Sequence, residues 1–171
     1  METDTFDVVG SDPYPITYEG ATVERAGQWA RSTRQAVAGS RGIWMVPQAF
    51  AVNGVAPTLE QMRSMAWQCI AEGAMGLIFY SWFELRADTE HPFDVRWSDL
   101  QLVAEEVNAM VPVLLSVEPA PTPEVTGASI IHWTVRRSGD IVYLIAVSDS
   151  STEAASAIVR FPERPEAVVH V

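Results

Sequence analysis

The sequence contains no lysine and only one cysteine, and its few residues of these types limit the partners and covalent bonds that we expect for it. Its basic residues are 11 arginines, set against 22 acidic residues, so the formal net charge at pH 7 is −11. A surface of this sign repels phosphate backbones, and nucleic acid is therefore not an expected partner. Because Cys69 has no second cysteine to pair with, an internal disulfide is excluded and we expect a buried structural thiol.

Long hydrophobic runs are also missing. No apolar stretch approaches the ~18 residues that a membrane span needs, and the N-terminus has no charged segment followed by an apolar one. We therefore expect no membrane partner, and the location is either cytoplasmic or not specified by the sequence. What the sequence has instead is 48% hydrophobic residues over 171 positions, which is enough to form a packed core.

The first two thirds of the chain alternate three times between a short apolar run and a helical pattern. Strands are predicted where β-branched and aromatic residues cluster, at 6–10, 43–46 and 76–83. Helices are predicted at 23–38, at 58–73 with a Thr58/Gln61 capping box, and from a second capping box at Ser98/Gln101 to Pro112. We expect an α/β fold in residues 1–116, with three parallel strand–helix units.

The last third of the chain has a different pattern. Prolines and small polar residues at 117–127 predict a stiff linker. Period-two alternation then predicts a small antiparallel β-domain at 128–171, an incomplete sandwich with strands near 131–135, 141–147, 157–161 and 167–171. A turn at 137–140 joins the first two strands, and His132 and His170 are expected at the surface or in cross-strand pairs.

Four motifs in the first part carry a resemblance to a known family. They are, in chain order, Asp7–Pro15 (DVVGSDPYP), Trp44–Phe50 (WMVPQAF), Pro57–Arg63 (PTLEQMR) and Gly73–Trp82 (GAMGLIFYSW). Their succession resembles the last three β/α units of a glycoside-hydrolase-like TIM barrel of the broad β-galactosidase-like type, followed by its C-terminal β-domain. The resemblance implies a partial (β/α) barrel, because a complete one needs about 250 residues. The activity that it implies is a hydrolase acting on carbohydrate.

By this resemblance, the carboxyl ends of the three strands would line a sugar cleft. Aromatic rings stack on the apolar faces of sugars, so the candidate substrate-binding residues are the four rings that follow the strands, Tyr14, Phe50, Tyr80 and Trp82. The alternative is that these rings only pack the rim of the barrel.

Glycosidic hydrolysis ordinarily needs two carboxyl groups. In the related families the nucleophile follows the seventh strand, where this chain carries Gln48, and an amide does not attack as a carboxylate does. The candidate catalytic set is therefore Asp12 and Glu84, with Gln48 as a hydrogen-bonding orienter between them. The alternatives are that Asp12 forms a loop turn, that Glu84 is a solvated charge, and that the chain is a non-catalytic carbohydrate-binding or assembly module.

Two further expectations concern partners. Asp88, Glu90 and Asp94 offer oxygen ligands within seven residues, with His91 among them, so that Ca²⁺ can be held there and activate water against an ester or lactone; otherwise this is a solvated acidic loop. Three parallel strands also leave two open sheet edges, and we expect the chain to self-associate as a homo-oligomer.

Overall fold

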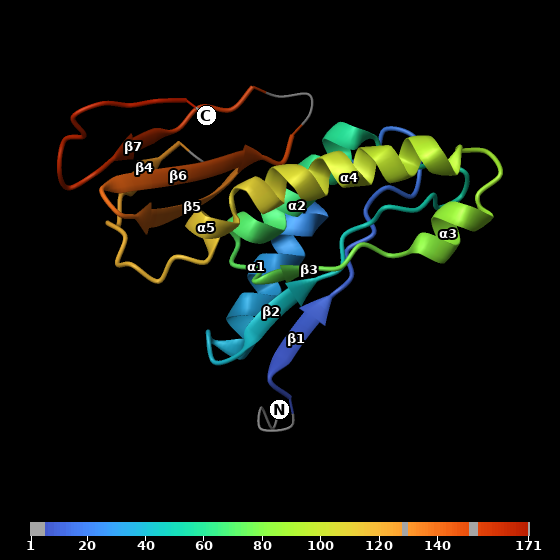
Figure 1. Cartoon of the computed structure of the whole chain (residues 1–171), viewed down its shortest axis with the longest axis horizontal. Coiled ribbons are helices and arrows are strands. Elements are labelled where there is room, and N and C mark those ends of the chain that lie inside the picture. Colours follow the sequence, from blue (N-terminus) through green and yellow to red (C-terminus); the bar gives the residue numbers. More distant parts are fainter. Residues whose placement is uncertain (1–5, 128–129, 151–153, 171) are drawn as a thin grey trace.

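The computed structural model describes residues 6–127, 130–150 and 154–170, and these form a mixed α/β structure (Figure 1). A three-stranded parallel sheet in the order β1-β2-β3 is built from β1 (Val8–Ser11), β2 (Gly42–Met45) and β3 (Gly76–Leu77). The helices are α1 (Arg25–Val37), α2 (Leu59–Ala71), α3 (Trp82–Ala87), α4 (Phe93–Ala109) and α5 (Val111–Leu114). The three parallel strands confirm the α/β prediction, and no closed barrel is present among the described residues.

Helices α1 and α2 form where the sequence predicts them. Thr58 accepts from the amide of Gln61, whose side chain accepts in return from the amide of Thr58, so the capping box is confirmed. One stripe of α2 is fully buried, namely Met62, Met65, Ala66, Cys69 and Ile70. The predicted apolar stripe of α1 holds only in part, because Trp29 remains 44% exposed while the small residues beside it are buried.

The predicted strand at 76–83 is shorter than its apolar pattern indicates. Strand β3 ends at Leu77, although the chain stays extended beside β2, since the amide of Ile78 donates to Met45 and Gln48 bridges to Tyr80. The side chain of Ser81 then accepts from the amide of Glu84 and starts α3. A local cap therefore ends the extended segment before its last two aromatic residues.

Helix α4 begins earlier than predicted. Its first residue is Phe93, so Ser98 lies inside the helix and the capping box expected there is wrong. Arg96, in the first turn, is buried and donates to the carbonyl oxygens of Pro57 and Ala49. These contacts attach the start of the helix to a distant loop, and no local pattern reports them. The interruption predicted at Pro112 is confirmed, because α4 ends at Ala109 and α5 is a separate turn with Pro112 near its start.

The antiparallel part consists of two small two-stranded sheets. One pairs β5 (Ile131–Ser138) with β6 (Ile141–Ser148), and the other pairs β4 (Glu124–Thr126) with β7 (Ile158–Arg160). Three of the predicted strands and the turn after Ser138 are confirmed. Strand β4 falls within the predicted linker, and the described residues 167–170 of the fourth predicted strand are not in a strand. Strands β5 and β6 pack against α2.

His132 in β5 is buried, at 3% exposure, which contradicts the expected surface position. Its Nδ1 lies 2.8 Å from an oxygen of Glu72 at the end of α2, and Arg31 on α1 donates to the same oxygen at 2.6 Å. Burial acts to raise the pKa of Glu72, but the hydrogen bonds from His132 and Arg31 outweigh it and lower that pKa to about 2. An ionised carboxylate therefore joins the hairpin to both helices.

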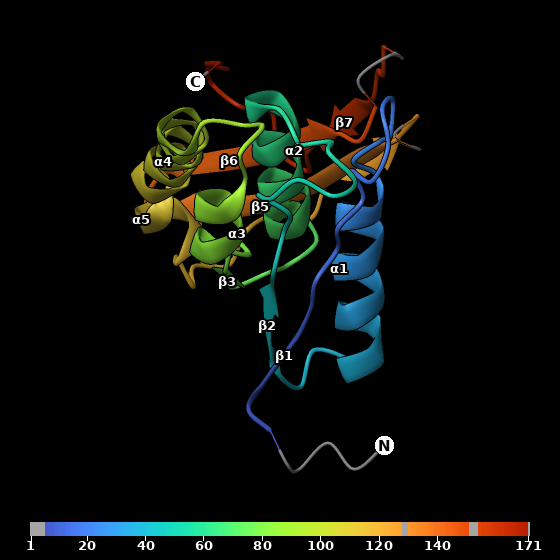
Figure 2. The same cartoon turned by 90° about the vertical axis from the view of Figure 1, so that its right-hand side faces the viewer.

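The two faces of the parallel sheet have opposite surroundings. Ile43 and Met45 point into the core beneath the helices, and α1 lies along this side of the sheet (Figure 2). On the other face, Val8, Trp44 and Ile78 keep 45%, 45% and 49% of their surface exposed. This face of the sheet is therefore apolar and open to solvent.

Candidate functional site

Three aromatic rings meet at the carboxyl ends of the parallel strands. Tyr14 follows β1, Phe50 follows β2 and Tyr80 follows β3. Their ring centroids are 5.0 Å apart for Tyr14 and Phe50, 5.5 Å for Phe50 and Tyr80, and 6.0 Å for Tyr14 and Tyr80. Tyr80 is 45% exposed, so the cluster presents aromatic surface to solvent. The structure thus brings together three of the four rings that the sequence singles out.

Gln48 holds the loops that carry this aromatic cluster. Its side chain is fully buried; the amide oxygen accepts from the Ile16 amide at 2.8 Å, and the amide nitrogen donates to the carbonyls of Ile16 at 2.8 Å and Phe50 at 2.9 Å. Both hydrogens of the amide are used by the backbone. Gln48 therefore fixes the segments of Tyr14 and Phe50 relative to each other, and it offers no free donor to a ligand.

Asp12 is exposed and lies beside Tyr14. Burial of the Tyr14 ring, together with the charge of Asp12 and a hydrogen bond to it, raises the pKa of Tyr14 to about 12. The tyrosine hydroxyl therefore stays protonated at neutral pH and donates to the carboxylate. This contact orients Asp12 at the edge of the aromatic cluster.

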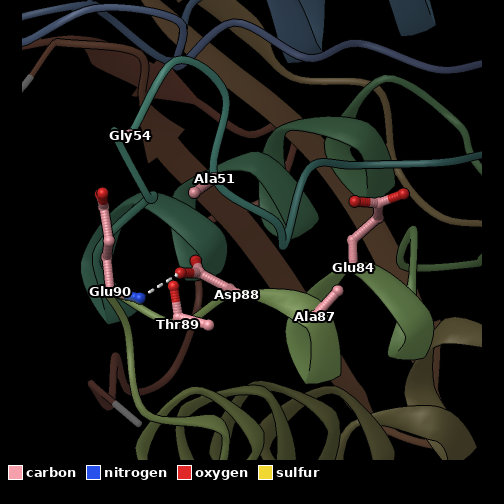
Figure 3. Close-up of a pocket in the computed structure, with 7 residues that line it drawn as sticks. All are labelled: Ala51, Gly54, Glu84, Ala87, Asp88, Thr89 and Glu90. Atoms are coloured by element: carbon pink, nitrogen blue, oxygen red, sulfur yellow. Dashed lines mark hydrogen bonds between the residues drawn. The ribbon is translucent and has the colours of Figure 1, made fainter.

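A cavity of about 300 Å³ lies between α3 and the loop that follows β2 (Figure 3). Ala51 and Gly54 form its loop side, and Glu84 projects from α3 on the other side. The loop turns tightly at Asn53 and Gly54, both with positive φ, and Val52 and Val55 close the turn with two backbone hydrogen bonds. Arg96 fixes this loop from beneath through the Ala49 and Pro57 carbonyls, a role that sequence patterns do not reveal.

The three acidic residues proposed as calcium ligands lie in three different local settings. Asp88 is engaged locally, because one oxygen accepts from the amides of Glu90 and His91 and the other lies 2.8 Å from Nδ1 of His91. Glu90 lines the cavity, and its carboxylate lies against Gly54. Asp94 belongs to the first turn of α4. Within the described ranges no three acidic, histidine or cysteine side chains are grouped as metal ligands.

Trp82, the fourth predicted sugar-binding ring, belongs to a second aromatic cluster on α3 and α4. Its ring contacts Phe83 and Phe93, and Phe93 stacks on Trp97 at 5.8 Å. Arg86 places its guanidinium over the rings of Trp82 and Phe93. Trp82 and Phe83 are 49% and 76% exposed, so this cluster forms a separate aromatic surface.

Comparisons with protein-family models, with curated proteins and with solved structures give no significant match to this chain. No helix in the part of the chain that the structure describes has the length and apolar character of a membrane span. The function must accordingly be inferred from the chemistry of the site.

Proposed function

We propose that this chain binds saccharides at the carboxyl ends of its parallel strands, in an architecture related to the glycoside hydrolases. The observation that carries this proposal is the convergence of Tyr14, Phe50 and Tyr80 from the ends of three successive strands. Partly exposed aromatic rings supply the apolar platform on which a sugar ring stacks. Carboxylates beside them supply hydrogen-bond acceptors for sugar hydroxyls.

The acceptors come from two sides of the aromatic cluster. Asp12 lies beside Tyr14, and Glu84 faces the neighbouring cavity. If the chain also hydrolyses its ligand, Asp12 and Glu84 are the carboxylates that we propose as acid and base, a role that requires a separation of about 5 to 9.5 Å across the bound sugar. Gln48 takes no direct part in this scheme, because its amide is committed to the loops.

Binding is tested by calorimetric titration of β-linked gluco- and galacto-oligosaccharides into the chain and into Tyr80→Leu. Leucine keeps the apolar packing but removes the stacking surface, and we expect binding to weaken about ten-fold. Tyr18→Leu is the matched control, since Tyr18 is 64% exposed and takes no part in the ring contacts of the cluster. Equal affinities for the two variants would overturn the proposal.

Hydrolysis is tested on the same protein with chromogenic glycosides, esters and lactones, with and without a chelator. A glycosidase should lose activity in Asp12→Asn and Glu84→Gln, whereas a calcium-dependent ester or lactone hydrolase should lose activity with the chelator. A chain that binds oligosaccharide but turns over none of these substrates is a carbohydrate-binding module.

Assembly is a second candidate function, and the open apolar face of the sheet favours it. Val8, Trp44 and Ile78 present apolar side chains next to two strand edges, and a second copy packed on this face would remove these side chains from water. Sedimentation velocity at micromolar concentration should detect a dimer that Ile78→Glu dissociates. Val95→Glu, at a 57% exposed position on α4, should leave it intact. A monomer of the unchanged chain contradicts this candidate.

A further inference from the structure

A second cavity, of about 330 Å³, lies where the β5–β6 hairpin meets α1 and α2, and none of the residues of the aromatic cluster lines it. Arg31 and Arg34 border it from α1, Glu72 borders it from the end of α2, and residues of β5 form its other side. No part of the saccharide proposal uses this cavity. Its lining is of interest because hydrogen-bond donors approach it from both sides.

On the strand side, the cavity meets the edge of β5. Trp133, Thr134 and Val135 all line it, and three consecutive residues do so only if the backbone edge, rather than one face, borders the space. A two-residue turn joins Ser138 to Ile141, which makes that pair hydrogen-bonded, and alternation along the strand then turns the amides of Trp133 and Val135 away from β6. In the described sheets β5 has no other strand neighbour, so these N–H groups face the cavity side together with the carbonyl groups of the same two residues.

On the helix side, two guanidinium groups lie next to each other. Arg31 donates to one oxygen of Glu72 at 2.6 Å and Arg34 donates to the other at 3.3 Å, and both use only Nη2. Their Nε and Nη1 groups donate to no other atom in the described parts of the protein. The side chains are 46% and 48% exposed, whereas the side chain of Glu72 is 6% exposed. The cavity therefore faces the cations more than the carboxylate that pairs with them.

The charges and hydroxyl groups nearby are consistent with this polarity. Glu72 already accepts from Arg31 and His132 on one oxygen and from Arg34 on the other, so its charge is largely compensated. Asp149 lies 3.5 Å from Nε2 of His132, and its negative charge also acts on Arg31. Thr134 accepts from Arg136 through its hydroxyl oxygen, which leaves its proton to be donated.

We propose that this cavity is a binding site for an oxyanion, a carboxylate or a phosphate, held between the Arg31 and Arg34 guanidinium groups and the unpaired edge of β5. Guanidinium groups pair with carboxylate and phosphate in a planar, charge-assisted geometry, and backbone amides at a sheet edge add neutral donors. An anion bound there would connect α1 to the hairpin and so link ligand binding to the docking of the two parts.

The test is calorimetric titration of sodium phosphate and sodium malonate into the whole chain at low ionic strength, with malonamide as the uncharged counterpart of malonate. We expect one saturable site for at least one anion and no heat from malonamide. Arg34→Gln should weaken binding about ten-fold, because it removes one charged donor. Arg164→Gln, which removes an exposed arginine elsewhere, should leave the affinity unchanged.

Arg34→Lys keeps the proposal testable if Arg34→Gln is unstable. Lysine preserves the charge but not the planar fork, so an intermediate loss of affinity is expected. Amide chemical shifts on titration should move at Trp133 and Val135. Absence of saturable binding for both anions, or equal affinity in the unchanged chain, Arg34→Gln and Arg34→Lys, would overturn the proposal. Neither result bears on saccharide binding, which involves different residues.

Discussion

The α/β part and the antiparallel part of this protein are stabilised in different ways. Up to α5, the chain buries a continuous apolar core in which Met45, Met62, Met65 and Cys69 have no exposed surface. Beyond α5, the only buried residues in the described segments are Pro123 and His132. The first part is stabilised mainly by apolar area removed from water. The second part packs on α2 through β5 and β6, and its buried residue at this contact, His132, has charged partners.

Because of this difference, the position of the β5–β6 hairpin depends on specific hydrogen bonds as well as on the apolar area that it buries. An apolar contact tolerates small shifts, whereas the oxygen of Glu72 must receive donors from α1 and β5 within hydrogen-bond distance. A buried ion pair adds little net stability compared with an apolar one, but removing one partner is costly because the others lose their compensation. Changes in this network should therefore act most strongly on the docking of the hairpin.

The largest effect is expected from Glu72→Gln. The amide keeps one acceptor oxygen but loses the charge, so His132 is buried without a carboxylate and the two arginines lose their anionic partner. We expect a loss of about 3 to 5 kcal/mol in the free energy of unfolding, measured by urea denaturation. The control is Glu105→Gln at an exposed position of α4, which should change it by less than about 0.5 kcal/mol. Similar losses in both variants would show that the network does not hold the hairpin.

Acid should remove much of the same stabilisation. The folded-state pKa of Glu72 is lowered from 4.5 to about 2, so the ionised carboxylate stabilises the fold above pH 4.5 and this contribution is lost as the pH falls from 4.5 to 2. The shift corresponds to roughly 3 kcal/mol. Denaturation curves across this range should show the loss in the unchanged chain and a flatter dependence in Glu72→Gln. Parallel pH profiles for the two proteins would contradict the assignment.

A smaller loss of stability is expected from a substitution at Gly27, where the His132 ring meets α1. A Cβ added at Gly27 would lie 2.3 Å from Cε1 of His132, so Gly27→Ala forces the ring to move. The expected cost is about 1 to 3 kcal/mol, even though alanine favours a helix by about 1 kcal/mol.

In a His132→Ala background the ring is gone, and Gly27→Ala should become stabilising. Thermal or urea denaturation of the four proteins measures this reversal, with Gln28→Ala as the exposed control on the same helix. A similar cost of Gly27→Ala in both backgrounds would mean that the close approach is relieved in another way.

The parts of the fold that sequence reasoning predicted depend on local signals. The Thr58 capping box, the three parallel strands and the β5–β6 turn follow from residues close together in the chain. Two of the errors involve distant partners. Strand β4 lies in a proline-rich stretch and exists through its pairing with β7. His132 is buried where it contacts Glu72, a residue 60 positions away in the sequence, and no pattern within β5 indicates this contact.

The same division applies to the candidate site. Residues after parallel strands share one edge of the sheet, and so the meeting of Tyr14, Phe50 and Tyr80 was predictable in outline. Trp82 was separated from them by the cap at Ser81, which turns the chain into α3. The commitment of Gln48 to backbone groups and the anchoring role of Arg96 depend on loop geometry, which composition and spacing do not specify.

The smallest effect concerns caps within the α/β part, where the same sequence signal proved correct once and wrong once. Thr58→Ala removes an observed cap and should lower the free energy of unfolding by about 1 kcal/mol. Ser98→Ala alters a residue inside α4, where alanine is the better helix former, so stability should stay the same or rise by a few tenths of a kcal/mol. Urea denaturation of both variants checks this. A cost for Ser98→Ala equal to that of Thr58→Ala would place the start of α4 at Ser98 rather than at Phe93.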